Sequence, residues 1–590
     1  MTRLSILTGG LLLAMSLQAH AQSRVVTLAG LCLHDSDDCR NLDYVLRQSE
    51  QALARGGVDL LVIPYTPFLS FAQEAAAEDL KPFSDLARAH SAYLCIALHE
   101  GAGEQTYATS VLLDRSGDIG FTWRKTHALA DDDHLALGDS LEVYHADFGT
   151  IAATIGTDFY FPEAYETLRM KGAEVILWQH YPERFREHST WEPLLAARAF
   201  DSHCHLVAAM YADPRAYITN RYSMGMQGAA FGRSMVINRV GVPIADTGYA
   251  EGVALATVDL DRRKQDPYDP WVQSENVFFV NCVGDRTALA PVAEPWTPAV
   301  PGPYSKRTAR LAVVYLNPEN SWRNGEVPRR LLELLAQAAD LRPDIILASE
   351  MSANEQDETT QEVLGQIAEK ARELNAYICI GGLGDAEHSS IARVWDRQGN
   401  QIYGQPLYWV KGFPEIEVFD TDFARVGCHS CGDLYTPMFD RVLALKGAEL
   451  ILDPSQMWGG SGRINETLLR ARAIDNGVWL ACAHWNSSDP GLRSVAIDPY
   501  GQVMAASRFQ QEGIFSVDID FDDKRVYYAG EAPDQPVPGT EGIGTYISGD
   551  LPKQLPGWRE MIFGRRHPEL YTIIPTVNEV TMQYRPHEGQ

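Results

Sequence analysis

Two cysteines, Cys428 and Cys431, stand three positions apart in the segment GCHSCGD at residues 427–433. Thiols at this spacing can form a dithiol redox site, supply half of a zinc site or close a small disulfide. One of them can also be a catalytic nucleophile with the other as a neighbour. The segment alone leaves these four possibilities open, so the surrounding elements must decide among them.

The chain contains one sequence unit twice. Four segments of the first half return in the same order in the second half, which is the signature of an internal repeat. The pairs are VDLLVIPY and PDIILASE (58–65, 343–350), AHSAYLCIA and ELNAYICIG (89–97, 373–381), LRMKGAEVIL and LALKGAELIL (168–177, 443–452), and LLAARAFDSHCHLVAA and LLRARAIDNGVWLACA (194–209, 468–483).

Each copy alternates short β-branched runs, which indicate buried strands, with stretches whose apolar residues recur at helical spacing. The segments DRSGDI and DRQGNQI predict hairpin turns. This alternation predicts an α/β layered fold. The expected divisions are a signal peptide (1–21), a first domain (22–284), a Pro-rich linker (285–306), a second domain (307–525) and a C-terminal tail (526–590).

Residues 24–262 and 307–522 resemble the nitrilase, or carbon–nitrogen hydrolase, superfamily. The resemblance is carried by a glutamate closing the strand DIILASE, a lysine after a hairpin, the elbow CGDLYTP, the strand KGAELIL and the helix RARAIDNG. It implies an αββα sandwich with one active site per copy. Family members pack two sandwiches into a four-layer αββα–αββα dimer, so two fused copies are expected to form an internal pseudo-dimer.

The resemblance assigns catalytic roles in the second copy. Cys431 is the expected nucleophile, Glu350 the general base and Lys411 the transition-state stabiliser. These types suit acyl transfer, because a carboxylate can take the thiol proton and an ammonium can stabilise a developing oxyanion. The backbone N–H of Gly432 is the expected second oxyanion donor. No metal and no cofactor enter this chemistry.

Three further assignments are less closely tied to the motifs. Lys411 stands further from its hairpin than Lys125 does in the first copy, which requires a small insertion before it and a deletion after it. Glu415 is a candidate auxiliary glutamate, with Glu417 behind it, and either could instead be a solvent-facing charge. Trp458 could line the substrate pocket or pack in the core.

The first copy departs from the pattern at its centre. Tyr65 stands where the second copy has Glu350, and Gly156 stands in place of Cys431, whereas Lys125 is retained. A lysine without a thiol or a carboxylate base cannot perform this reaction. The first copy is therefore expected to be a degenerate, inactive domain.

Two other residues are expected to be structural. Asp433 should cap the turn that follows Cys431 or bond the local backbone. Arg472 should make an ion pair unrelated to chemistry, because its counterpart Arg198 persists in the first copy.

Composition and the first residues limit the functional classes. The 590 residues carry a formal net charge of −28 with no basic stripe, which argues against nucleic acid as a partner. Residues 1–21 have Arg3, an apolar run over 4–17 and the sequence AHA at 19–21, as secretory signal peptides do. We expect cleavage after Ala21 and a periplasmic or secreted protein without a membrane-spanning segment.

Alignment of the copies bears on the two cysteines. Cys428 aligns with Ala153, a strand residue, and no second ligand pair stands at zinc-site spacing. A redox pair and a zinc site are therefore disfavoured. In an oxidising compartment, Cys32 and Cys39 could form a local disulfide.

The function that follows is an exported amidase that cleaves a non-peptide amide C–N bond through a thioester. The same thioester would also serve a nitrilase or an N-acyltransferase, and a non-catalytic binding protein is a further alternative. The expected partner is a small-molecule amide, with no nucleic acid and no membrane, and assembly into a further homo-oligomer is left open.

Overall fold

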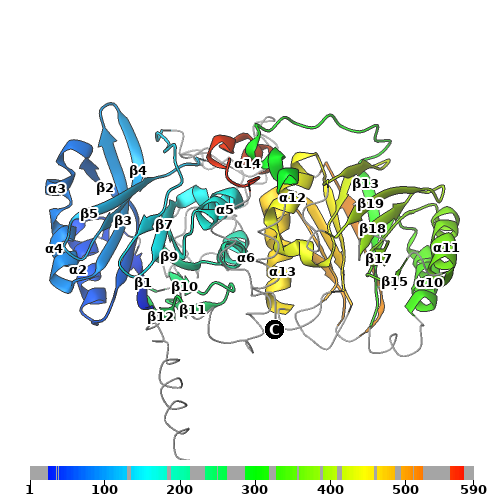
Figure 1. The fold of residues 1–590 in the computed structure, drawn as a ribbon, viewed down its shortest axis with the longest axis horizontal. Coiled ribbons are helices and arrows are strands. Elements are labelled where there is room, and N and C mark those ends of the chain that lie inside the picture. The colour runs from blue at the N-terminus through cyan, green and yellow to red at the C-terminus, as the bar shows by residue number, and fades with distance from the viewer. Residues whose placement is uncertain are drawn as a thin grey trace, which may run out of the picture.

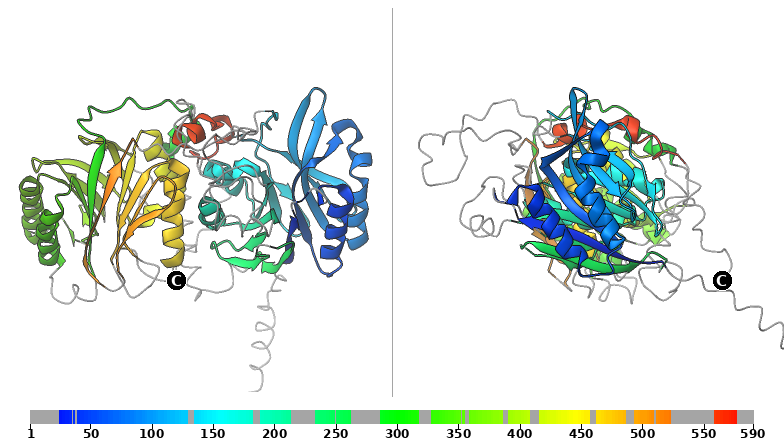
Figure 2. Two further views of the ribbon diagram at one scale, coloured as in Figure 1. Left: turned by 180° about the vertical axis from the view of Figure 1, so that it is seen from behind. Right: turned by 90° about the vertical axis from the view of Figure 1, so that its left-hand side faces the viewer.

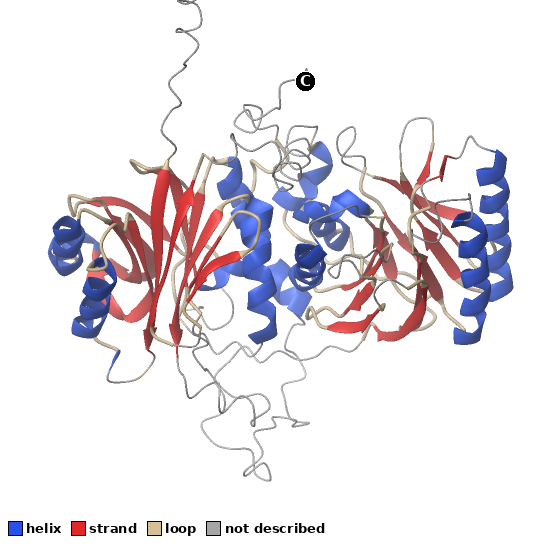
Figure 3. Ribbon diagram, turned by 90° about the horizontal axis from the view of Figure 1, so that it is seen from below, coloured by secondary structure: helices blue, strands red, loops and turns tan. Residues whose placement is uncertain are grey.

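The structure is a computed structural model that describes residues 24–34, 36, 39–128, 134–181, 188–212, 233–248, 250–261, 286–317, 327–351, 353–354, 358–385, 390–407, 415–456, 462–485, 493–508, 511–522 and 558–576. Two units lie side by side along the long axis (Figure 1): the first unit, residues 24–261, and the second unit, residues 307–522. Helices cover the outer end of each unit, and further helices lie between the two units (Figure 3). The α/β class predicted from the sequence is confirmed.

The first unit consists of strands flanked by two groups of helices. Its strands are β1 (Val25–His34), β2 (Leu60–Ala72), β3 (Tyr93–Ala102), β4 (Gln105–Leu113), β5 (Ile119–Arg124), β6 (Tyr144–His145), β7 (Thr150–Ile155), β8 (Val175–Gln179), β9 (His205–Ala212), β10 (Met235–Ile237), β11 (Pro243–Asp246) and β12 (Gly252–Asp259). Its outer helices are α2 (Leu42–Leu53), α3 (Ala76–Asp79) and α4 (Lys81–His90), and its inner helices are α5 (Pro162–Met170) and α6 (His188–Ser202). The short 3-10 helices η2 (Gln73–Ala75) and η4 (Gly156–Tyr160) follow β2 and β7.

The second unit has the corresponding elements. Its strands are β13 (Thr308–Tyr315), β14 (Ile345–Ala348), β15 (Ala353–Asn354), β16 (Tyr377–Ile380), β17 (Leu383–Gly384), β18 (Ile391–Trp395), β19 (Gln401–Pro406), β20 (Val418–Asp420), β21 (Arg425–Cys428), β22 (Leu450–Pro454), β23 (Trp479–Ala483), β24 (Val495–Ile497), β25 (Val503–Ala506) and β26 (Gly513–Asp520). Its outer helices are α10 (Val327–Gln337) and α11 (Glu358–Leu374), and its inner helices are α12 (Pro437–Leu445) and α13 (Gly462–Asn476). The 3-10 helices η7 (Ala338–Leu341) and η9 (Cys431–Tyr435) complete it.

Strand order is the same in both units. In the second unit the two main sheets run β19-β18-β16-β14-β13-β26 and β20-β21-β22-β23-β24-β25. In the first unit the corresponding orders are β5-β4-β3-β2-β1 with β12 on β1, and β6-β7-β8-β9 with β10 and β11 beyond. There the two sheets join where β1 pairs with β9. The parallel strands β7–β9 and β21–β23 are buried on both faces, as their continuous apolar sequences require.

The predicted hairpin turns are confirmed at β4–β5 and β18–β19. Gly117 and Gly399 occupy corresponding positions in these turns, and both have φ of +79°. A side chain at either glycine would also strike a backbone carbonyl of an outer helix, Ser84 on α4 or Ala368 on α11. Only glycine meets both demands, which fixes where each hairpin sits against its helix.

Helices α6 and α13 face each other across the boundary between the units. Arg198 on α6 pairs with Asp475 on α13 at 2.6 Å, and Arg472 on α13 pairs with Asp201 on α6 at 2.7 Å. The two ion pairs are reciprocal, because each helix supplies one arginine and one aspartate. All four side chains are buried, so both pairs are shielded from water. The ion pair predicted for Arg472 is confirmed.

The linker and part of the tail pack back over this boundary. They contribute the 3-10 helices η6 (Thr287–Ala293) and η10 (Pro568–Leu570) and helix α14 (Trp558–Gly564), which lies over both units (Figures 1 and 2). Trp558 donates from its indole to the carbonyl of Ile474 at 2.7 Å, and Arg566 pairs with Glu163 on α5 at 2.7 Å. The tail thus contacts both units.

The cysteines of the described residues are free. The prediction of a disulfide between Cys32 and Cys39 is wrong, since both thiols are free. Cys32 is buried within β1, and its thiol hydrogen-bonds with Thr247 and Ser234. Within the described part of the chain, no helix is both long and apolar enough to span a bilayer.

Candidate active site

Cys431 begins the 3-10 helix η9, just after β21. Its φ is +52°, in the left-handed region that costs a non-glycine residue roughly 1–3 kcal/mol. Two buried carboxylates hold this turn: Asp453 accepts the N–H of Cys431 at 3.1 Å, and Asp433 accepts the N–H of Ser430 at 2.9 Å. The capping role predicted for Asp433 is confirmed, and the partly exposed thiol is presented from a rigid elbow.

Glu350 lies two residues beyond β14 and is only 4% exposed. Its carboxylate accepts hydrogen bonds from the Ser390 hydroxyl at 2.7 Å, from the Cys431 thiol and from the backbone N–H of Gln456. Burial raises the pKa of Glu350 to about 7, with the nearby charge of Asp453 acting in the same direction and these hydrogen bonds opposing it. The structure therefore brings together the predicted nucleophile and the predicted base.

The position of Glu350 is fixed by close packing. Trp485 donates from its indole to the Glu350 carbonyl at 2.8 Å. A side chain on Gly381 would approach Cγ of Glu350 and Cβ of Pro454 at 2.9 Å, so only glycine fits there. A base restrained in this way keeps its geometry to the thiol through the reaction.

A family model described as carbon-nitrogen hydrolase matches residues 25–268 and 310–528, well over half of the chain. The chain belongs to the carbon–nitrogen hydrolase family. This places it in the nitrilase superfamily, among homologues of amidases.

Relatives of this hydrolase include the deaminated glutathione amidase of Homo sapiens, 31% identical over 206 residues that make up 32% of this chain and 59% of the human protein. The deaminated glutathione amidase of Synechocystis sp. is 33% identical over 124 residues, 21% of this chain and 42% of that protein. The chain thus spans about half the length of the curated relatives it matches.

Two solved structures are similar to part of the chain. Saccharomyces cerevisiae Nit3, a member of branch 10 of the nitrilase superfamily, has a TM-score of 0.35 and 20% identity over 42% of this chain and 97% of its own. A mutant of the amidase from Nesterenkonia sp. AN1, in complex with butyramide, has a TM-score of 0.33 and 18% identity over 42% of this chain and 97% of its own.

Cys428 of the hydrolase does not act with Cys431. Its buried thiol lies 3.8 Å from Sγ of Cys379, on the neighbouring sheet, and burial raises the pKa of Cys428 well above its usual value. Both cysteines of GCHSCGD are free. The C-x-x-C spacing therefore holds one partly exposed cysteine and one core cysteine.

Two predicted site residues, Lys411 and Trp458, lie outside the described residues. The hairpin register shows which residue of the second unit corresponds to Lys125. The backbone N–H of Lys125 donates to the Ala108 carbonyl, and the backbone N–H of Leu407 donates to the Ser390 carbonyl in the same way. Leu407 therefore occupies the register position of Lys125, and Lys411 comes four residues later in the sequence.

The auxiliary predictions differ in their placement. Gly432 is buried in the first turn of η9, where backbone amides have no partner within the turn and can face an oxyanion. Glu415 is exposed, and its carbonyl accepts from the Gln405 amide at 3.2 Å. Glu417 pairs with Lys446 at 3.3 Å. The structure gives Glu415 no contact with Glu350 or Cys431 among the described residues.

The corresponding place in the first unit has different contents. Tyr65 is buried against an apolar cluster where the second unit has Glu350. Gly156 has φ of +52°, like Cys431, and its carbonyl accepts from the Trp178 indole at 2.9 Å. Lys125 is fully buried. The backbone of an elbow is present, but the thiol and the carboxylate are not.

Ser390 and Asp453 were not predicted from the sequence. Both are polar where the first copy has an apolar residue, Ala108 and Trp178 respectively. The pair Cys431 and Gly156 differs between the copies in a comparable way. A position-by-position comparison of the two copies could therefore have identified Ser390 and Asp453 as candidate site residues. In the described residues no cluster of His, Cys, Asp or Glu is arranged to hold a metal ion.

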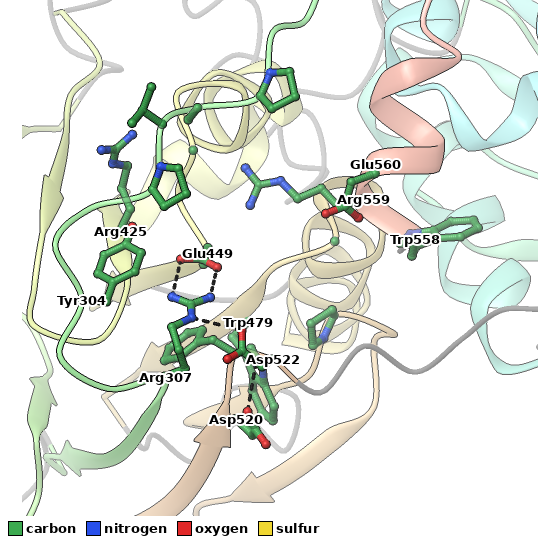
Figure 4. A pocket seen from close by; sticks show the side chains of 18 of the residues that line it. Tyr304, Arg307, Arg425, Glu449, Trp479, Asp520, Asp522, Trp558, Arg559 and Glu560 are labelled. Atoms are coloured by element: carbon green, nitrogen blue, oxygen red, sulfur yellow. Dashed lines mark hydrogen bonds and ion pairs between the residues drawn. The ribbon is translucent and has the colours of Figure 1, made fainter. Parts of the chain in front are cut away.

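A pocket of about 440 Å³ opens elsewhere on the second unit (Figure 4). It is walled by residues 298–301 of the linker and by Arg307 and Glu449, and neither Glu350 nor Cys431 lines it. Arg307 bridges Glu449 and Asp522. The first unit repeats this trio as Arg24, Glu174 and Asp261. Charges present in both units belong to the fold, so this pocket is not assigned to catalysis.

Proposed function

We propose that the chain is an exported amidase that hydrolyses a non-peptide amide through a Cys431 thioester. The observation that carries the proposal is the hydrogen bond between the Cys431 thiol and the buried Glu350 carboxylate, whose pKa of about 7 suits a general base near neutral pH. Membership of the carbon–nitrogen hydrolase family supports the reaction class.

The first half of the reaction forms the acyl-enzyme. Glu350 takes the proton from Cys431 Sγ, and the thiolate attacks the amide carbonyl carbon. The N–H of Gly432 and the ammonium of Lys411 would stabilise the oxyanion. The C–N bond then breaks, the protonated Glu350 gives its proton to the leaving nitrogen, and ammonia or an amine departs.

The second half regenerates the enzyme. Glu350 takes a proton from water, and the resulting hydroxide attacks the thioester carbon. The C–S bond breaks, the thiolate recovers a proton from Glu350, and the carboxylic acid product loses its proton to water and leaves as a carboxylate. One carboxyl group thus serves twice as base and twice as acid, which requires a pKa close to the working pH.

The test is release of ammonia from small primary amides such as butyramide, and release of the amine product from deaminated glutathione; the names of similar proteins suggest both substrates. Cys431→Ala should lose activity by at least about 10³-fold. Cys428→Ala is the matched control, because it removes the neighbouring thiol, and should keep activity within about threefold. Equal losses in both variants would exclude Cys431 as the nucleophile.

We further propose that the first unit is a degenerate copy that takes the place of a second subunit. The reciprocal ion pairs between α6 and α13 support an internal pseudo-dimer, and Tyr65 and Gly156 support the loss of chemistry. Specific activity should then stay constant on dilution from micromolar to nanomolar chain. A loss of activity on dilution would instead indicate that a second chain completes the site.

The location of the enzyme is also a proposal, supported by the pattern of residues 1–21. Periplasmic or secreted material should begin at Gln22 when its N-terminus is sequenced. An enzyme recovered from the cytosol with residues 1–21 attached would contradict export.

A further inference from the structure

A row of buried charged side chains leads from the first unit toward Cys431. It begins at Asp201 on α6, whose two carboxylate oxygens accept from Arg472 on α13 at 2.7 and 2.8 Å. On its other side, Nε of Arg472 lies 3.7 Å from a carboxylate oxygen of Asp440 on α12. Arg472 and Asp440 are completely buried, so water screens their charges little.

His429 continues the row within the second unit. Its Nδ1 lies 2.6 Å from Asp440, and its Nε2 lies 3.4 Å from Asp453 at the end of β22. Burial alone would lower the pKa of His429, but the two carboxylates raise it well above its usual value, which favours the protonated ring. The carboxylates approach different ring nitrogens, which leaves neither nitrogen for a metal ion.

Asp453 ends the row at the nucleophile. One of its oxygens faces His429, and the other accepts the Cys431 N–H at 3.1 Å. The position of the Asp453 carboxylate therefore sets the direction of the Cys431 amide, at the residue whose φ is +52°. It also sets how much negative charge Glu350 faces.

The first unit has neutral side chains at the same positions. His429 and Asp440 correspond to Thr154 and Tyr165, whose hydroxyls lie 2.9 Å apart, and Asp453 corresponds to Trp178. The guanidinium of Arg198 lies over the Tyr165 ring at 5.6 Å, on the side where Arg472 has the carboxylate of Asp440. The ion pairs across the boundary are reciprocal, but the charged row extends only toward the cysteine.

We propose that the row Asp201–Arg472–Asp440–His429–Asp453 positions Cys431 for reaction, so that Asp201 of the first unit acts on the nucleophile of the second. The proposal rests on Cys431 being the nucleophile. Without Asp201, Arg472 draws Asp440 toward itself and away from His429. The imidazolium and Asp453 then shift, and the thiol turns away from Glu350.

The chain offers a matched pair of variants, Asp201→Asn and Asp475→Asn. Each breaks one of two reciprocal buried ion pairs of nearly equal length, so both should lower stability alike. Of the two aspartates, only Asp201 accepts hydrogen bonds from Arg472, the arginine that lies beside Asp440. The readout is the rate at which iodoacetamide alkylates Cys431, followed by peptide mass spectrometry from pH 5 to 9, beside kcat and KM for an amide.

Asp201→Asn should lower the alkylation rate and kcat by about tenfold and shift the pH profile of alkylation, with KM nearly unchanged. Asp201→Glu should recover much of the loss, and Asp475→Asn should stay within about twofold of wild type. Equal effects of Asp201→Asn and Asp475→Asn, or no effect of either, would overturn the proposal.

Alkylation needs no substrate, so the outcome is separate from the proposed function. If Asp201→Asn changes the alkylation of Cys431 but the wild-type protein has no amidase activity, the result would support the row of charges and contradict the proposed amidase function. Should Asp201→Asn fail to fold, Asp440→Asn interrupts the row within the second unit, and an unchanged pH profile of alkylation in that variant would equally overturn the proposal.

Discussion

Cys431 and Gly156 have the same backbone conformation, with φ of +52° at corresponding points of the two units. The elbow turn is thus present in both units, although only the second unit has a thiol at this position. A backbone turn of this kind depends on neighbouring contacts, such as Trp178 with the Gly156 carbonyl and Asp453 with the Cys431 amide, as much as on the residue at its tip.

Restoring the thiol alone should not restore catalysis in the first unit. In a Cys431→Ala background, Gly156→Cys is expected to remain inactive, because Tyr65 fills the place of the base. Ammonia release measured over hours would detect activity at about 10⁻⁴ of wild type. Turnover by this double variant would show that the thiol by itself is sufficient, contrary to the role given to Glu350.

The rate should depend on the ionisation of Glu350. Because its pKa is raised to about 7, mainly by burial, kcat/KM should fall about tenfold per pH unit below 7. The Ser390 hydrogen bond opposes the raised pKa, so Ser390→Ala should move the acid limb about one unit higher. Rate profiles from pH 5 to 9 test both, and a flat profile down to pH 5 would contradict the assignment.

Glu350→Gln should stabilise the fold at neutral pH while abolishing activity. The folded-state pKa of about 7 lies above the ordinary value of 4.5, so the native state loses stability as pH rises through this interval. The loss reaches about 3 kcal/mol above pH 7, and the variant lacks it. Urea unfolding at pH 5 and pH 8 measures the difference.

The exposed Glu415 supplies the control for this experiment. Glu415→Gln should leave the free energy of unfolding within about 0.5 kcal/mol of wild type at both pH values. If Glu350→Gln were no more stable than wild type at pH 8, the carboxylate would not be strained by burial.

Lys411 should contribute charge and Leu407 only packing. Lys411→Ala is expected to lower kcat by about 10²-fold or more, as loss of an oxyanion donor does. Leu407→Ala removes the side chain at the register position of Lys125 and should change kcat only severalfold. Single-turnover kinetics on one amide compare the two, and full activity of Lys411→Ala would leave the oxyanion to backbone amides.

The sequence predicted the parts of the site that are encoded locally. Glu350 closes the segment DIILASE and Cys431 opens the segment CGDLYTP, and these local motifs carried the family resemblance from which both residues were predicted. The hairpins could also be predicted from the local sequence, because Gly117 and Gly399 mark turns that only glycine tolerates.

Contacts made by long-range packing could not be read in this way. Ser390 reaches Glu350 only because β18 and β14 lie in one sheet on either side of β16, and no local pattern carries that information. The pairing of Arg472 with Asp201 crosses between the units, whereas the sequence indicated only that Arg472 has a structural partner.

Placing both faces of a boundary in one chain removes a constraint that identical subunits obey. In a symmetrical dimer every substitution at the interface occurs twice, so a residue that helps one side must be tolerated on the other. Here Arg472 lies beside Asp440 while its counterpart Arg198 lies over Tyr165. Under the pseudo-dimer proposal, a boundary inside one chain permits a division of labour, in which one half specialises in support while the other keeps the chemistry.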